Sequence, residues 1–454
     1  MGKLHVGYAQ VNINPPLGIG IEGYYVPRFA KGFLDDMLVS ALALQVGDTT
    51  VVMASCDHIG FGEQFPRYRA AIAEAAGIPM ENVYLTCTHT HTGPSVFPGF
   101  GFEQPEEPVY KYADFVENRL RDVAVLAIND LTPARMGFIY GYAPERVAYI
   151  RRYKMKDGSS LTCPPINDPN IDHPIGTLDQ RVNVLRFDQE NGQTIVLYNY
   201  GVHVDCIGGE LVSADFPGWV RTTIAKALDG VKAIYFPGCQ GDVGSTNVHP
   251  QGGDMNDTEI SFDNEMKSPG MARFVGRALA GTILQVFDKV EYIDVNKLSI
   301  LHKVVQVKSN KPTPDDNMEQ AHLFKKLHDE GRDDEIPFEA MQLTTEIAKA
   351  DRLCRLENGP DFFELNLTAL RIGDVAFVGF PGEPFTDIGR QTKTAEGWKL
   401  ILPCCVTNGY VGYFPTKDAY DEGGYEANTT SYHSSVAETL VSGAKELLAE
   451  LSQK

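Results

Sequence analysis

Two histidines one residue apart are the residues of this chain whose types and spacing point most directly to chemistry. His89 and His91 stand in the stretch LTCTHTHTGPSVF, at the end of a β-branched run that predicts a strand. Side chains two positions apart in a strand point to the same face, so both imidazoles are expected to enter one space. Neutral imidazole is the commonest metal ligand, and a catalytic zinc uses three protein ligands and a water. The pair therefore predicts a metal site; the alternative is one histidine in the core and one on the rim.

Further ligands must come from other segments. His203 in YGVHVD follows an apolar run and is the best candidate, with a core position as the alternative. Glu383 in GFPGEPF occupies a predicted turn, where an acid that favours a helix N-terminus is the alternative. Further acids and bases stand at predicted strand ends and, taken singly, are typical of turns and caps: Asp57, His58, Asp205, Asp215 and Asp242.

The elements that must position these residues follow a rhythm of short apolar strands, polar turns and helices. TVVMASC, NVYLTC and TIVLYNY are strand-like runs that alternate with helical segments, while NKLSILHKVVQV and FFELNLTALRIGDVAFVGF look like antiparallel neighbours. We expect an α/β fold with a mixed sheet, or two stacked mixed sheets, flanked by helices. The site is expected at the C-terminal ends of the strands. The charged segment 309–361 predicts a helical insertion, with an interdomain linker as the alternative.

Composition excludes several classes of function. Forty Lys and Arg against 60 Asp and Glu give a net charge of −20, which repels polyanions and argues against a nucleic-acid partner. No run is apolar for long enough to predict stable membrane insertion, and the first residues lack the apolar core of an export signal. The sequence therefore predicts a cytoplasmic protein, unless a leader was removed. The eight cysteines lack CxxC spacing and are expected to be reduced. No pattern indicates an oligomeric state.

Several motifs taken in order resemble the catalytic domain of the neutral ceramidases, zinc amidases that split an N-acyl sphingosine. They are THTHTGP, VH, GDV, PGEPF and the tyrosine-rich stretch TNGYVGYFPTKDAYDEGGYEA. The resemblance covers most of the chain. It implies one catalytic domain over residues 1–454, without the further C-terminal β-domain of that family.

The resemblance also implies roles for particular residues. Zinc would be held by four side chains, which are His89, His203, Glu383 and Tyr413. The rest of the active site would consist of His91, Tyr425 and, as a looser match in YIRRYK, Arg151. The family's serine position falls on Gly244 of GDVGSTN, with Ser245 one place late, so a serine nucleophile is not expected.

The expected function is a zinc-dependent hydrolase that cleaves a linear amide. Zinc lowers the pKa of a bound water to about 7, which would supply the attacking hydroxide without a serine. His91 would pass a proton to the leaving amine, and Tyr425 and Arg151 would stabilise the oxyanion. A small soluble amide is expected as the substrate, or a lipid-like one walled by PSVFPGFGFEQPEEP (94–108). A zinc esterase or lactonase, or a metal-stabilised protein that only binds a small ligand, are the alternatives.

Overall fold

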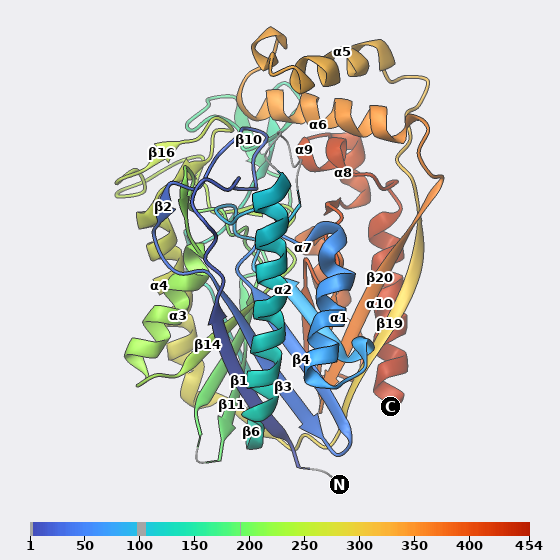
Figure 1. Cartoon of the computed structure of the whole chain (residues 1–454). Helices are drawn as coiled ribbons and strands as arrows, with labels where there is room; N and C mark the ends of the chain where they lie inside the picture. The colour runs from blue at the N-terminus through green and yellow to red at the C-terminus, as the bar shows by residue number, and fades with distance from the viewer. Residues whose placement is uncertain (1–2, 98–105, 191) are drawn as a thin grey trace.

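Figure 1 shows a computed structural model of the chain, which describes residues 3–97, 106–190 and 192–454. The large sheet is mixed and has the order β14-β12-β11-β6-β1-β3-β4-β5, with β18 added to β6. Its strands are β1 (His5–Asn12), β3 (Leu38–Val46), β4 (Thr49–Cys56), β5 (Val83–Cys87), β6 (Thr132–Tyr142), β11 (Arg181–Gln189), β12 (Thr194–Tyr200), β14 (Lys232–Pro237) and β18 (Glu291–Ile293). The second sheet consists of β19 (Leu298–Lys308), β20 (Phe362–Ile372), β21 (Val375–Gly379) and β23 (Leu400–Cys404).

The helices and shorter elements complete the described chain. The helices are α1 (Phe65–Ala76), α2 (Glu106–Asn129), α3 (Asp215–Ala227), α4 (Pro269–Val286), α5 (Met318–Asp329), α6 (Ala340–Glu357), α7 (Thr386–Thr392), α8 (Lys417–Glu422), α9 (Tyr425–Thr429) and α10 (Val436–Gln453). The short strands are β2 (Gly32–Phe33), β7 (Tyr149–Ile150), β8 (Arg152–Met155), β9 (Ser160–Thr162), β10 (Ile171–Pro174), β13 (Leu211–Val212), β15 (Val243–Gly244), β16 (Glu259–Ile260), β17 (Met266–Lys267), β22 (Glu383–Pro384) and β24 (Tyr413–Phe414). Single 3-10 turns are η1 (Gly62–Gln64), η2 (Met80–Asn82), η3 (Phe287–Lys289) and η4 (Asp333–Glu335).

The two sheets stack face to face with helices on both outer surfaces. In β4, Val51 and Met53 enter the core shared with the second sheet, whereas Val52 and Ala54 enter the core under α1 and α2. This alternation explains the unbroken apolar runs, because a strand buried on both faces needs no polar side. Helices α3 and α4 cover the other half of the large sheet, and α10 covers the second sheet. The predicted α/β fold class is confirmed, and of its two expected arrangements, one mixed sheet or two stacked mixed sheets, the structure has the second.

Three pairs of parallel strands bring several chain segments to one end of the molecule. β4 pairs with β5, β12 with β14, and β21 with β23 in parallel, and the remaining main pairings are antiparallel. Hydrogen bonds also join the exits of different pairs: the N–H of Cys405 donates to the Pro237 carbonyl at 3.0 Å, and Thr86 bridges to Thr407. The C-terminal ends of the parallel strands of both sheets therefore meet at one edge. Sites form at this edge in such folds.

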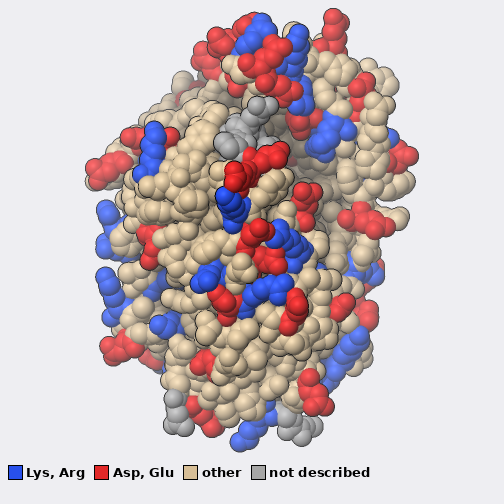
Figure 2. All heavy atoms as spheres, viewed as in Figure 1, with Lys and Arg blue, Asp and Glu red and all other residues tan. Residues whose placement is uncertain are grey.

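The segment 309–361 contains α5 and α6, which come after β19 and before β20 in the sequence, and these two strands pair antiparallel with each other. Figure 1 shows these helices at the top of the molecule, and α6 packs on α9 next to the strand ends. Part of the predicted apolar wall, residues 98–105, lies outside the described residues. None of the helices in the described ranges has the length and apolar character needed to cross a membrane. Figure 2 shows acidic and basic side chains interspersed on the viewed face, without a broad basic surface there.

Candidate metal centre

His89 and His91 come together through a loop, and not through the alternation of a strand. β5 ends at Cys87, and His89 has a left-handed φ of 74°. The loop follows the exit of the neighbouring strand β4, because the N–H groups of Thr88 and His89 donate to the carbonyls of Cys56 and His58 at 2.8 Å each. The two imidazole rings lie 5.1 Å apart. The expectation of a same-face pair within the strand was wrong, since the backbone turns before the histidines, but both rings do enter one space.

His203 lies on the segment that leaves β12. This segment passes close to the exit of β14, where a Cβ on Gly201 would lie only 2.3 Å from the Cys239 carbonyl oxygen, so a glycine is required there. The Nδ1 of His203 contacts the carbonyl oxygens of Gln240 at 2.8 Å and Val243 at 2.9 Å. The segment that follows β14, the parallel neighbour of β12, thus orients the imidazole.

Glu383 and Tyr413 are direct partners in a two-residue parallel ladder. β22 pairs with β24 so that Glu383 stands beside Tyr413, and the Glu383 N–H donates to the Gly412 carbonyl at 2.9 Å. Both segments follow strands of the second sheet. The pairing explains how the turn motif PGEPF and the tyrosine-rich stretch reach the same place from about thirty residues apart.

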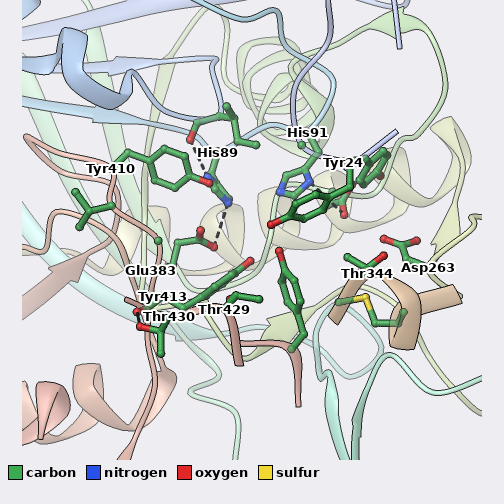
Figure 3. Close-up of a pocket in the computed structure, with 18 of the residues that line it drawn as sticks. Tyr24, His89, His91, Asp263, Thr344, Glu383, Tyr410, Tyr413, Thr429 and Thr430 are labelled. Carbon is green, nitrogen blue, oxygen red and sulfur yellow. Dashed lines mark hydrogen bonds and ion pairs between the residues drawn. The ribbon is translucent and has the colours of Figure 1, made fainter. Parts of the chain in front are cut away.

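The polar atoms of these segments converge. The Oε2 of Glu383 lies 3.1 Å from the Nε2 of His89, as Figure 3 shows. The same oxygen lies 2.9 Å from the Nε2 of His203. Ligand atoms of His89, His91 and His203 all lie within 4.8 Å of one another. All four side chains are buried. The structure therefore brings three of the four predicted ligands into contact and adds His91 to the same cluster.

The protonation of the histidines makes this cluster fit a cation. The Nδ1 of His89 contacts the Ile59 carbonyl at 2.7 Å, and that of His203 also faces carbonyls. A carbonyl oxygen only accepts, so each Nδ1 carries a hydrogen, and in the neutral tautomer that this allows the lone pair of the ring is on Nε2. Those lone pairs face the Glu383 oxygen, and none of these three buried atoms has a hydrogen-bond partner. Acceptors that face each other at this distance need a proton or a metal cation between them, and imidazole nitrogen with carboxylate oxygen is a donor set that suits zinc.

The surroundings of Glu383 and His91 determine how these two side chains ionise. Burial raises the pKa of Glu383, but the neighbouring His89 and His203 outweigh it and hold the pKa well below its usual range, so this carboxylate is charged. Burial, followed by the neighbouring His89 and His203, lowers the pKa of His91 well below its usual range. His91 is therefore neutral in the free protein.

A cavity of about 500 Å³ opens beside the cluster and is lined by all the remaining predicted site residues. Arg151 donates to Glu426 at 2.7 Å and to the Gly241 carbonyl at 3.0 Å, and its guanidinium lies 5.4 Å from the Tyr413 ring centre. The rings of Tyr413 and Tyr425 lie 5.6 Å apart. Arg151, Tyr413 and Tyr425 thus share one wall; their roles, and that of Tyr413 as a ligand, stay predictions.

Four of the other acids and bases at strand ends, Asp57, His58, Asp215 and Asp242, serve the fold, whereas Asp205 lines the pocket. Asp215 accepts the N–H groups of Cys206 and Ile207, and Asp242 accepts from Thr386. His58 packs on Phe61 as a core residue, with burial lowering its pKa to about 4. Such residues look like the ligands in sequence because both kinds follow strands.

Asp57 forms a buried ion pair, which predicts a loss of stability when its partner is removed. Arg221 donates to both carboxylate oxygens of Asp57, at 3.0 and 2.6 Å. Arg221→Met is expected to lower the free energy of unfolding by about 3–5 kcal/mol, because it leaves a buried charge without a partner. Urea unfolding measures this loss, and Asp57→Asn added to Arg221→Met should restore part of it. A loss below about 1 kcal/mol would mean that water reaches the carboxylate.

Several residues of the pocket were not predicted from the sequence. Tyr24, Phe262 and Asp263 line it from segments without a recognisable motif, and Glu426 fixes Arg151 from inside the tyrosine-rich stretch. Tyr24 in GYYVPRF shows only a local excess of aromatic residues. Ser245, one place after the family's serine position, lines a different cavity and faces α4.

Comparison with known proteins identifies the fold. Neither a protein-family model nor a curated protein matches the chain. Among solved structures, a neutral ceramidase from Pseudomonas aeruginosa superposes with a TM-score of 0.72 at 16% identity, over 100% of this chain and 75% of that one. A ceramidase complexed with C2 superposes with a TM-score of 0.69, also at 16% identity, over 99% of this chain and 76% of that one. The chain has the ceramidase fold, so the fold implied by the motif resemblance is confirmed.

Proposed function

We propose that this protein is a metal-dependent hydrolase that cleaves a non-peptide amide bond, with zinc as its metal. The observation that carries this proposal is the convergence of the Nε2 atoms of His89 and His203 on Glu383 in a buried, otherwise unpartnered cluster. The ceramidase fold supports the amide as the bond that is cleaved. A small soluble amide, or a lipid-like one, fits a cavity of about 500 Å³.

The roles of the side chains follow from their positions. His89, His203, Glu383 and Tyr413 would hold zinc, which when bound polarises a carbonyl and lowers the pKa of a water. His91 is neutral, and both of its ring nitrogens lack a hydrogen-bond partner, so it can take a proton and deliver it to the leaving amine. Arg151 and Tyr425 would donate to the developing oxyanion, a contribution of about 2.7–4 kcal/mol for each donor.

The metal is the first point to test. Protein purified without chelators is expected to contain one zinc per chain by elemental mass spectrometry, because one cluster of this kind exists in the described residues. Removal of the metal with a chelator should abolish amide hydrolysis, and readdition of zinc should restore it. A folded protein that neither contains nor takes up metal would contradict the proposal and favour a binding function.

The bond is the second point. The same groups would also cleave an ester or lactone, because their chemistry acts on any polarised carbonyl. A panel of N-acyl amines with matched esters separates the two activities. Faster turnover of the amides, relative to their uncatalysed hydrolysis, supports the amidase.

A further inference from the structure

A second group of charges lies on the wall of the same pocket, outside the metal cluster. It consists of Asp205, Asp263, Glu265 and Lys267, all of them buried. Lys267 pairs with Asp205 at 2.5 Å and also with Glu265. The group thus contains one ammonium and three carboxylates, and it carries an excess of negative charge when its acids are ionised.

Asp263 is the carboxylate of this group with which Lys267 forms no ion pair. It lines the pocket and is only 8% exposed, and the hydroxyl of Ser261 donates to it. No Lys, Arg or His in the described ranges forms an ion pair with it. Burial, and then the charge of Glu265, raise the pKa of Asp263 above its usual value, and the charge of Lys267, which lowers it, does not outweigh them.

The two arginines that line the pocket, in contrast, each have a carboxylate partner. Arg151 is paired with Glu426, and Arg355 lies 3.6 Å from Asp351. The charge on the pocket wall that lacks a partner is thus negative. A cation is the ligand that would complete it.

The position of Asp263 suits one end of an extended substrate. Figure 3 shows Asp263 and Thr344 on the side of the pocket opposite Glu383 and Tyr410, with His91 and Tyr24 between. Tyr24 packs edge-on against Phe262 with ring centres 5.7 Å apart. A ligand that spans the pocket would pass these rings and the unpartnered nitrogens of His91.

We propose that the substrate is an amide bearing an aliphatic ammonium group, and that Asp263 binds this group while the amide lies at the metal cluster. This inference rests on the proposed amidase function and names its substrate class. A primary ammonium offers three hydrogens and one positive charge, which matches a buried carboxylate without a cationic partner. Asp263 would thus determine specificity without taking part in bond cleavage.

The test compares amides that differ only in charge. N-acetylated diamines with three to six carbons are paired with N-alkylacetamides in which a methyl group replaces the ammonium. A second series carries the ammonium on the acyl side. In the metal-loaded protein, kcat/KM for the best charged amide is expected to exceed that of its neutral partner by roughly 10- to 100-fold, as for one charge-assisted hydrogen bond.

Asp263→Asn is expected to remove this preference by lowering kcat/KM for the charged amides to that of their neutral partners, since asparagine keeps the shape and loses the charge. The matched control is Asp374→Asn, which removes a charge at the exposed β20–β21 turn and should keep the preference. No preference for charged amides in either series, or a preference that survives Asp263→Asn, would overturn the inference.

A binding measurement separates this inference from the proposed function. If no amide is cleaved, the intact charged and neutral amides are titrated into the same metal-loaded protein by calorimetry. Tighter binding of the charged amide that Asp263→Asn abolishes would retain the ammonium site while the amidase proposal fails. Equal binding of the two amides would overturn the ammonium site itself.

Discussion

The His203→Asn protein is expected to lose its metal and to hydrolyse amides at least about 1,000-fold more slowly, because the groups of a catalytic site act together and the loss of one disables the others. An asparagine amide can reach the carbonyls of Gln240 and Val243 as the Nδ1 does. It has no counterpart of the Nε2 that lies 2.9 Å from Glu383. The substitution therefore removes the ligand atom and keeps the bonds that position the segment.

Metal per chain and kcat/KM are the quantities to measure, with thermal unfolding as a check on the fold. His322→Ala is the matched control, since this histidine is 54% exposed on α5 and should leave both quantities unchanged. A His203→Asn protein that keeps a full equivalent of zinc would show that the cluster is not the metal site.

His91→Ala is expected to keep the metal and to lower kcat by about 100- to 10,000-fold, the usual contribution of a general acid–base group. His91 has no hydrogen-bond partner on either ring nitrogen, and its Nδ1 lies 3.6 Å from Asp205. Nothing thus holds its proton in the free protein, which suits a residue that exchanges protons with substrate. Elemental analysis and steady-state kinetics on the same preparation measure both effects.

The geometry gives this test a definite alternative. His91 lies with His89 and His203 in a group whose ligand atoms are within 4.8 Å of one another, an arrangement that three-histidine metal sites also show. Metal loss in His91→Ala equal to that in His203→Asn would make His91 a ligand. His91→Gln separates proton transfer from hydrogen bonding, because glutamine can donate a hydrogen bond but cannot carry a proton. Recovery of activity in His91→Gln would contradict the role of proton carrier.

Much of the fold could be predicted from local pattern. Apolar runs of strand length, such as TVVMASC and TIVLYNY, became buried strands, and the glycine at Gly77 ends α1 in the left-handed conformation. The stacking of two sheets was one of two expected arrangements. The interface between sheets decides it, because Met53 of β4 and Phe377 of β21 share one core although they lie far apart in the sequence.

The candidate site was predictable in its members more than in its geometry. His89, His203 and Glu383 follow strands that end at one edge, so a sequence pattern could propose them together. The sequence could not distinguish these candidate ligands from other acids at strand ends that only stabilise the fold. Asp57 and Asp215 follow strands as well, yet Asp57 meets Arg221 from a distant segment, and Asp215 accepts two backbone N–H groups from the loop that precedes it.

The sequence by itself determined the succession of strands and helices, the acidic surface and the supply of imidazole and carboxylate groups at strand ends. Those properties depend on local periodicity and composition. Only the tertiary structure decided that the backbone turns before His89, that Glu383 lies against two Nε2 atoms, and that Asp263 forms no ion pair within the described ranges. Each of these depends on contacts between segments that the fold alone brings together, because hydrogen bonds and ion pairs act over a few ångströms whatever the separation in sequence.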